Sequence, residues 1–346
     1  MRGYLILLLL CGVAAGAPTA AHPPYSLVAD RSGNVYFSDL ETVWRLSEDG
    51  RLSIFRPHVR GTHVHALALA PDGSIDGDQN HYDTATKRFY SGLWRRTVAG
   101  TEQAIVPMTE RPPPGMGLWQ DSVGNRYTSQ WLSSVDRRMV LLRRKQNGGV
   151  EVLFDETGGG GPRPSQVSTE SVGGMAFGPE GSLVFTNGGV LRQRTPDGRT
   201  MEIYDGGTAS NLRGVAVAAD GDILVADTSA KAVLAFHRDG TFSTLFQEKA
   251  PWHPTAVALT RGRLLVLEAN ADPYDREDRV RVVEVKDGKG TVVASPVDAQ
   301  GAHATVPSSE APRGSLSSRL ILLASLASSV AVFAAWRFRS VSKPNS

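Results

Sequence analysis

Six polar residues occupy equivalent places in the sequence, each six positions after a glycine in a tight-turn motif. They are Asp39, Gln79, Gln130, Asn187, Asp227 and Glu268. Carboxylate and amide oxygens are the ligands that Ca²⁺ and Mg²⁺ prefer. One interpretation is a ring of oxygen ligands, in which a divalent cation is held by Asp39, Asn187, Asp227 and Glu268. The alternative is that these strand ends are polar because they meet solvent, and that Asp caps turns.

A second group of polar residues precedes the strands that lead into three of these turns. The group consists of His63, His65, Asn211, Arg213 and His253. Histidine titrates near neutral pH and acts as a general base or a metal ligand, so His65 and His253 are the candidate catalytic groups. The candidate ligand-binding residues are His63, Asn211, Arg213, Gln79 and Gln130. The alternative is that the histidines are ordinary loop residues.

The turn glycines belong to an internal repeat. Each repeat reads as an apolar strand, a tight turn with glycine and a second apolar strand, in segments 27–39, 67–79, 118–130, 175–187, 215–227 and 257–268. The glycines of this first turn are Gly33, Gly73, Gly124, Gly181, Gly221 and Gly262. A second turn and a further strand follow in every repeat, at Gly50, Gly100, Gly149, Gly198, Gly240 and Gly288. Glycine supplies the positive φ that such hairpins need, so each repeat has four strands and two hairpins.

Six four-stranded repeats predict an all-β fold, a six-bladed β-propeller over residues 22–298. A pair of β-sandwiches is the alternative, but it would not require one unit repeated six times. Because the first two strands of a blade are antiparallel, the start of one and the end of the other lie at the same end of the propeller. The predicted polar residues should therefore gather around one mouth of the central channel. Residues 78–83 are expected to form a loop there, as part of a binding rim or as an ordinary turn.

The two ends of the chain predict export and membrane anchoring. Residues 1–21 combine an early Arg, a short leucine-rich run and small residues, which is typical of a signal peptide. Residues 299–318 are rich in Ala, Pro and Ser and indicate a flexible linker. Residues 319–337 include a run without charge from Leu320 to Trp336, which predicts a transmembrane helix, and residues 338–346 form a short basic tail on the cytoplasmic side. The propeller is thus expected on the periplasmic or extracellular side.

The repeat resembles the NHL-repeat family and the wider group of six-bladed propellers that includes SMP-30/gluconolactonase-like proteins and streptogramin B lyase. The resemblance is carried by residues 214–227 (GVAVAADGDILVAD) and residues 26–39 (SLVADRSGNVYFSD). For the lactonase branch it implies a metal held by a Glu in the first blade and by an Asn and an Asp before later first strands. Here Tyr25 and Ser26 stand at the first-blade position, and Asn211 alone is similar to the family's Asn element. His65 and His253 occupy places similar to a histidine of the streptogramin-lyase-like propellers.

Composition excludes several classes of function. The formal net charge is +2, so no basic field is available for nucleic acid. The only cysteine is Cys11, which excludes a disulfide scaffold, a cysteine nucleophile and a cysteine-ligated zinc site in the repeats. The sequence thus predicts an exported, membrane-anchored module that binds a small ligand or a protein at the channel mouth, with no certain cofactor. The alternative is a Ca²⁺- or Mg²⁺-dependent lyase or lactone/ester hydrolase.

Overall fold

The computed structural model describes residues 24, 26–83, 85–111, 116–133, 138–155, 172–270 and 280–296, without the side chains of residues 130–133 and 138. The predicted signal peptide, linker, transmembrane helix and basic tail lie outside these ranges and stay predictions. Within these ranges, no helix is both long enough and apolar enough to span a membrane.

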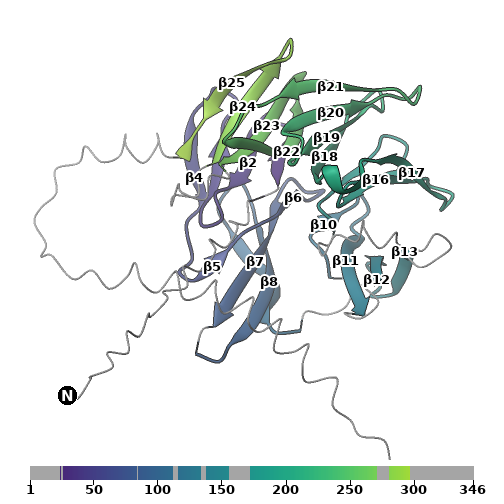
Figure 1. The fold of residues 1–346 in the computed structure, drawn as a ribbon. Helices are drawn as coiled ribbons and strands as arrows, with labels where there is room; N and C mark the ends of the chain where they lie inside the picture. The colour runs from purple at the N-terminus through teal and green to yellow at the C-terminus, as the bar shows by residue number, and fades with distance from the viewer. Residues whose placement is uncertain are drawn as a thin grey trace, which may run out of the picture.

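Six antiparallel sheets follow one another along the chain (Figure 1). The first is formed by β1 (Leu27–Ala29), β2 (Val35–Ser38), β3 (Val43–Leu46) and β4 (Leu52–Arg56). The second is formed by β5 (Thr62–His63), β6 (Leu67–Leu69), β7 (Ile75–Asp83), β8 (Arg88–Arg96) and β9 (Glu102–Thr109). The third is formed by β10 (Trp119–Gln120), β11 (Arg126–Ser133), β12 (Arg138–Arg144) and β13 (Val150–Asp155).

The second half of the ring repeats the same order. The fourth sheet is formed by β14 (Gly174–Phe177), β15 (Leu183–Asn187), β16 (Val190–Arg194) and β17 (Thr200–Asp205), and the short 3-10 helix η1 (Gly207–Ala209) follows it. The fifth is formed by β18 (Leu212–Val217), β19 (Ile223–Asp227), β20 (Ala232–Phe236) and β21 (Phe242–Gln247). The sixth is formed by β22 (Trp252–Thr260), β23 (Arg263–Asn270), β24 (Val280–Lys286) and β25 (Lys289–Ala294). These sheets are called blades 1 to 6 below.

The hairpins form where the glycine pattern predicts them. All six glycines of the first turns have positive φ, as Gly221 at 94° illustrates. Five glycines of the second turns do so as well, but in blade 3 the residue with positive φ is Gly148 (88°) and not Gly149. Two adjacent glycines leave the sequence ambiguous there, because either one could take the left-handed conformation.

The core lies between the blades. Alternate residues of one strand point to opposite faces of its sheet. In β15, Phe185 joins an apolar cluster with blade 3, whereas Val184 joins a cluster with blade 5. In β19, Val225 faces blade 4 and Ala226 faces blade 6. Strands buried on both faces explain the continuous apolar runs in the repeats.

The ring closes by packing of the last blade on the first. One cluster combines Phe37 and Trp44 of blade 1 with Leu265, Leu267 and other residues of blade 6. In the described ranges every sheet consists of strands that are consecutive in sequence, so closure needs no exchanged strand. The predicted six-bladed propeller with four-stranded blades is confirmed, and blade 2 carries the additional short strand β5.

Small residues let the inner strands approach one another around the axis. A Cβ atom on Gly214 of β18 would lie 2.5 Å from the Cα atom of Ala256 in β22, which is too close for any side chain. The inner strands of all six blades surround a cavity of about 250 Å³. Most residues that line it have apolar side chains, among them Leu27, Leu67, Trp119, Met175, Val215 and Val257.

Blade 2 departs from the common pattern. Residues 78–83, expected as a loop, instead continue β7, which pairs with β8 as far as Asp83 and Arg88. The expectation was wrong because polar residues were taken to end the strand, although backbone pairing with β8 extends it. The β7–β8 hairpin consequently projects from the body of the propeller (Figure 1).

Candidate functional site

The six predicted polar residues lie within four residues of the ends of the second strands of the blades, next to the beginnings of the first strands. Asn187 and Asp227 end their strands and Asp39 directly follows β2, whereas β7, β11 and β23 continue past Gln79, Gln130 and Glu268. In blade 5, Asp227 is in register with Leu212, and in blade 6, Glu268 is in register with Pro254. We refer to this end of the propeller as the ring end. The register places the two sequence groups at one end, as the antiparallel strands require.

Asp39 in blade 1 caps its own turn. Its Oδ1 atom accepts hydrogen bonds from the amides of Glu41 (3.1 Å) and Thr42 (2.7 Å), and its Oδ2 atom accepts one from Trp44 Nε1 (2.7 Å). These contacts match the turn-capping interpretation of this position. Both carboxylate oxygens of Asp39 thus serve the local structure.

Gln79 in blade 2 binds a buried arginine. Arg56, at the end of β4 in blade 1, donates from Nη2 to Gln79 Oε1 at 2.7 Å. The same guanidinium pairs with Glu102 of β9 and lies 4.6 Å from the ring centre of Trp94. This cluster joins blades 1 and 2, and no sequence motif marks Arg56 because its partners lie 23 and 46 positions away.

Asp227 in blade 5 accepts three hydrogen bonds. Its donors are the Asn211 amide (3.1 Å), the Ala230 amide (3.0 Å) and the Ser210 hydroxyl. The next residue, Thr228, donates from its amide to the Asn211 carbonyl and from Oγ1 to the Pro254 carbonyl.

His253 of blade 6 completes this chain of contacts. Its Nδ1 atom lies 3.0 Å from the Thr228 carbonyl, so it carries the proton and donates it there. The structure therefore brings together Asn211, Asp227 and His253, three of the residues predicted from sequence, at the junction of blades 5 and 6.

Glu268 is fully buried at the same junction. Its Oε2 atom accepts a hydrogen bond from Arg281 Nε at 2.7 Å, whereas its Oε1 atom has no hydrogen-bond partner. Arg281 also binds Glu248 Oε2 at 3.1 Å and lies 4.1 Å from the ring centre of Trp252. Burial raises the pKa of Glu268 to about 7, against the opposing effect of the Arg281 guanidinium. The carboxyl group is thus poised to gain or lose a proton near neutral pH.

His65 belongs to a polar network in blade 2. The amides of His65 and Ala66 donate to Asp78 Oδ1, at 2.8 and 2.9 Å. Asn80 Nδ2 contacts both Asp78 Oδ2 (2.9 Å) and His65 Nδ1 (3.1 Å). Because the Asn80 amide is the donor, neutral His65 carries its proton on Nε2. The ring of His63 lies 6.0 Å from that of His65, in an edge arrangement.

The remaining predicted residues lie in blades 3 to 5. Asn187 ends β15 and is 4% exposed, and its Nδ2 atom has no hydrogen-bond partner. Arg213 of β18 is largely buried, and its carbonyl accepts a hydrogen bond from Thr186 Oγ1 at 3.0 Å. Gln130 lies in β11 opposite Val140, and its side chain is outside the described residues.

The described residues contain no group of three or more His, Cys, Asp or Glu side chains placed to hold a metal ion. Asp39 serves its own blade, whereas Asp227 and Glu268 belong to the junction of blades 5 and 6. The assignment of Asp39, Asn187, Asp227 and Glu268 to a metal stays a prediction.

A second buried ionic cluster lies away from the ring end. Asp76 at the beginning of β7 binds Arg95 Nε at 2.7 Å and Arg126 Nη2 of blade 3 at 2.9 Å. Asp76 is 1% exposed, so this cluster holds blades 2 and 3 together rather than facing a ligand. Sequence reasoning missed it because no motif links residues 50 positions apart.

Together, six closed blades and a cavity on their common axis define the chain as a six-bladed β-propeller. No protein-family model matches the chain, and no curated protein sequence matches it significantly. Solved structures of similar fold include virginiamycin B lyase from Staphylococcus aureus, at 14% identity and a TM-score of 0.49, with 78% of this chain and 84% of the lyase covered.

Two further structures come from the other group that the repeat resembles. Regucalcin from Agrobacterium tumefaciens, described as a calcium-binding protein, is 17% identical at a TM-score of 0.49, with 80% of this chain and 93% of that chain covered. A gluconolactonase from Xanthomonas campestris is 11% identical at a TM-score of 0.47, with 73% and 85% covered. The structural neighbours thus include both groups named from the sequence, while the fold assignment itself rests on the six sheets.

Proposed function

We propose that this chain is a membrane-anchored propeller that works outside the cytoplasm and binds a small ligand or a protein partner at the ring end. The observation that carries this proposal is the cavity of about 250 Å³ on the propeller axis, lined mostly by residues with apolar side chains. Concave apolar sites with a few fixed polar groups nearby are the usual form of ligand pockets. The size of the cavity favours a small ligand.

Polar groups for orienting a ligand lie at the ring end, on the strands that line this cavity or just before them. Asn211 precedes the lining residue Gly214 by three positions, and His253 precedes Ala256 by three. The contacts of Thr228 with the Asn211 and Pro254 carbonyls and with the His253 ring hold this part of the rim in place. Groups that are fixed before binding lose little conformational entropy when the ligand arrives.

The binding function is tested by native mass spectrometry of the full chain purified from membranes. We expect a co-purifying small molecule on the wild-type protein and its loss from Ala29→Trp, which fills the cavity at a lining residue. The control is Val150→Trp, at an exposed position on the outer strand β13. A ligand that survives Ala29→Trp, or that is absent from the wild type while no protein partner co-purifies, contradicts the proposal.

One observation favours the second candidate, a Ca²⁺- or Mg²⁺-dependent lyase or lactone/ester hydrolase. The Oε1 atom of Glu268 is buried without a partner, which leaves one ring carboxylate with an uncommitted oxygen. A metal that binds only the folded protein raises the melting temperature as its concentration increases. If Ca²⁺ or Mg²⁺ does so and Glu268→Gln abolishes the shift, this candidate replaces the binding function.

A further inference from the structure

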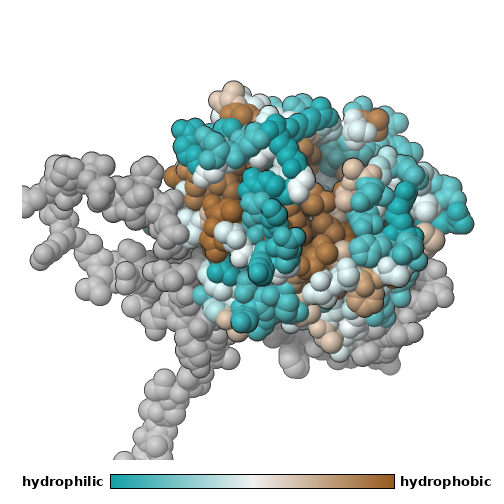
Figure 2. All heavy atoms as spheres, turned by 90° about the horizontal axis from the view of Figure 1, so that it is seen from above, coloured by the Kyte–Doolittle hydropathy of each residue, from teal (hydrophilic) through white to brown (hydrophobic). Residues whose placement is uncertain are grey.

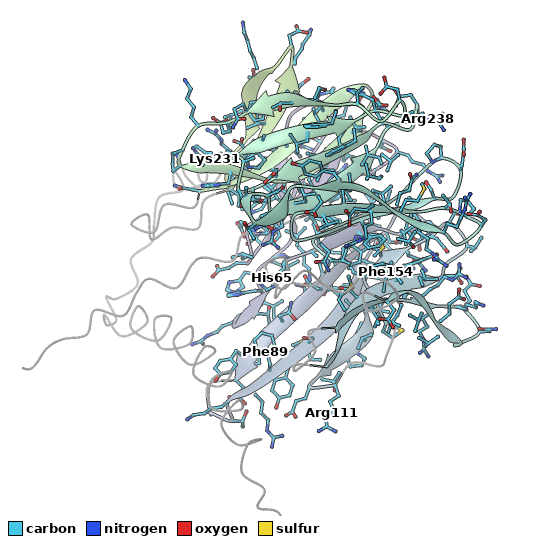
Figure 3. All side chains as sticks on the ribbon, turned by 45° about the vertical axis from the view of Figure 1, so that its right-hand side comes forward. His65, Phe89, Arg111, Phe154, Lys231 and Arg238 are labelled. Atoms are coloured by element: carbon cyan, nitrogen blue, oxygen red, sulfur yellow. The ribbon has the colours of Figure 1, made fainter. Side chains whose placement is uncertain are left out.

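The β7–β8 hairpin reaches farther from the ring end than the hairpins of blades 1, 4 and 5. Strands β2, β15 and β19 stop at or one residue before their ring position, whereas β7 continues four residues past Gln79 to Asp83. At about 3.3 Å per residue this adds roughly 13 Å. Figure 3 shows Phe89 and Arg111 at the projecting end of blade 2, beyond His65.

The end of this hairpin combines aromatic, apolar and basic side chains. Phe89 is 54% exposed, and its ring centre lies 6.1 Å from that of Tyr82. His81 pairs with Tyr90 and lies with its Nδ1 atom 2.6 Å from the Gly61 carbonyl, which places the 57–61 loop beside the hairpin. We call the exposed residues of this region the blade 2 tip, namely Val59, Arg60, Lys87, Arg88, Phe89, Met108 and Arg111.

Basic residues outnumber acidic ones at the blade 2 tip. Four of its residues are Arg or Lys, and the nearby acids are Asp83, Glu110 and Glu41, whose Oε2 atom lies 3.5 Å from His58 Nδ1 in the 57–61 loop. Asp83 caps the turn by accepting hydrogen bonds from the Ala85 amide and the Thr86 hydroxyl, and Glu110 pairs with Arg88 at 2.7 Å. The tip therefore presents a positive surface around an exposed aromatic ring.

Both ends of the propeller sequence emerge at the same ring end. β1 begins there, because Leu27 pairs with Phe37 near the end of β2. β25 also ends there. Ala294 of β25 pairs with Val282 of β24, and β24 begins at the ring end because its first residue, Val280, pairs with Ala269 near the end of β23. The chain continues for 346 − 296 = 50 residues after the described part, and these include the uncharged run 320–336.

We propose that the blade 2 tip contacts the surface of the anionic membrane in which the C-terminal segment is anchored. This inference rests on the membrane anchor of the proposed function. A tether that leaves from the ring end keeps that end near the bilayer, so the projecting hairpin can reach the lipid. Aromatic rings favour the headgroup region, and Lys and Arg near the surface are attracted to anionic lipid.

Site-directed spin labelling tests this contact in the full chain. Cys11 is the only cysteine, so Cys11→Ser gives a background without thiols. A label at Phe89→Cys is compared with one at Val98→Cys, which is 50% exposed in the turn at the opposite end of β8. The proteins are reconstituted in vesicles of phosphatidylcholine with phosphatidylglycerol and of phosphatidylcholine alone.

With phosphatidylglycerol present, we expect the label at position 89 to be shielded several-fold from a water-soluble nickel relaxant and to become more accessible to oxygen. The label at position 98 should stay fully aqueous. Replacing Lys87 and Arg111 with Glu should remove the shielding, whereas the matched changes Arg199→Glu and Arg238→Glu should not. Equal aqueous signals at positions 89 and 98 overturn the inference, and protection of position 89 only in intact cells overturns it in favour of a protein partner.

Flotation of the vesicles at high salt separates this inference from the anchor. If the protein floats with the vesicles but the label at position 89 stays exposed to water, the membrane contact of the blade 2 tip is overturned and the anchor is supported. If the label is shielded but the protein does not float with the vesicles at high salt, the contact is supported and the anchor is contradicted. If the protein shows neither flotation nor shielding of the label, both the contact and the anchor are overturned.

Discussion

Glu268 is the residue whose chemistry depends most on its surroundings. It lies between blades 5 and 6 with one carboxylate oxygen bound to Arg281 and the other without a partner. Burial, together with the nearby Glu248 carboxylate, disfavours its charged form more than the Arg281 guanidinium favours it. A buried carboxyl group of this kind links protonation to the stability of the blade junction.

Glu268 should make the propeller less stable as the pH rises. Its pKa is about 7 in the folded protein and near 4.5 in the unfolded chain. Between these values the folded state holds a proton that the unfolded chain has released, so the free energy of unfolding falls as pH increases and levels off above pH 7. Glu268→Gln should match wild type below pH 4.5 and exceed it by up to about 3 kcal/mol at pH 8.

Urea unfolding of both proteins across this pH range measures the effect. Arg281 keeps a hydrogen-bond acceptor in Glu268→Gln, so the comparison isolates the carboxyl charge. Parallel stability profiles for the two proteins would refute the raised pKa.

Arg56 should contribute to stability through several contacts at once. It joins Glu102, Gln79 and the ring of Trp94 across the junction of blades 1 and 2, and its side chain is 5% exposed. Glu102 keeps its pair with Arg96, but Arg56→Ala removes the charged hydrogen bond to Gln79 and the contact with the Trp94 ring, so it should cost about 2–3 kcal/mol. Arg199→Ala is the control, since Arg199 forms an exposed pair with Asp197. Equal losses in the two variants, measured by chemical denaturation, would contradict this role.

The strands and turns were the most predictable elements. Glycines at fixed spacing and apolar runs between them determine the hairpins, because positive φ and burial are local requirements. The contacts that Arg56, Arg281 and Asp76 make with neighbouring blades could not be predicted, since each depends on which blade faces which. The same limit applies to β7, whose polar end is held by pairing with β8 rather than by burial.

The inner strands should tolerate no added side chain at Gly214. Its Cβ atom would meet the Cα atom of Ala256 at 2.5 Å, and that backbone cannot move without disturbing the neighbouring blade. Gly214→Ala should therefore destabilise the protein by roughly 1–3 kcal/mol. Gly149→Ala is the control, because only the flexible side chain of Asn147 lies near that position. A melting temperature unchanged in Gly214→Ala would show that the inner strands are more loosely packed.

Closure of the six blades into a ring brings the residues of the candidate site together. Seen from above, the surface is largely polar, with apolar residues gathered in hollows (Figure 2). Residues more than two hundred positions apart meet only because blade 6 packs on blade 1 through a shared apolar cluster. The axial cavity, the ring end and the position of the blade 2 tip all depend on this closure.

Cross-linking between Glu48 and Arg261 tests closure most directly. These residues form an ion pair between blades 1 and 6, although they are 213 positions apart. In a Cys11→Ser background, we expect Glu48→Cys with Arg261→Cys to be joined by a short bis-maleimide in the folded full chain and not in urea. The unlinked control is Val150→Cys with Arg261→Cys, because Val150 is exposed on β13 of blade 3, across the ring from blade 6. Failure of the first pair to cross-link in the folded protein would contradict the closed six-bladed ring.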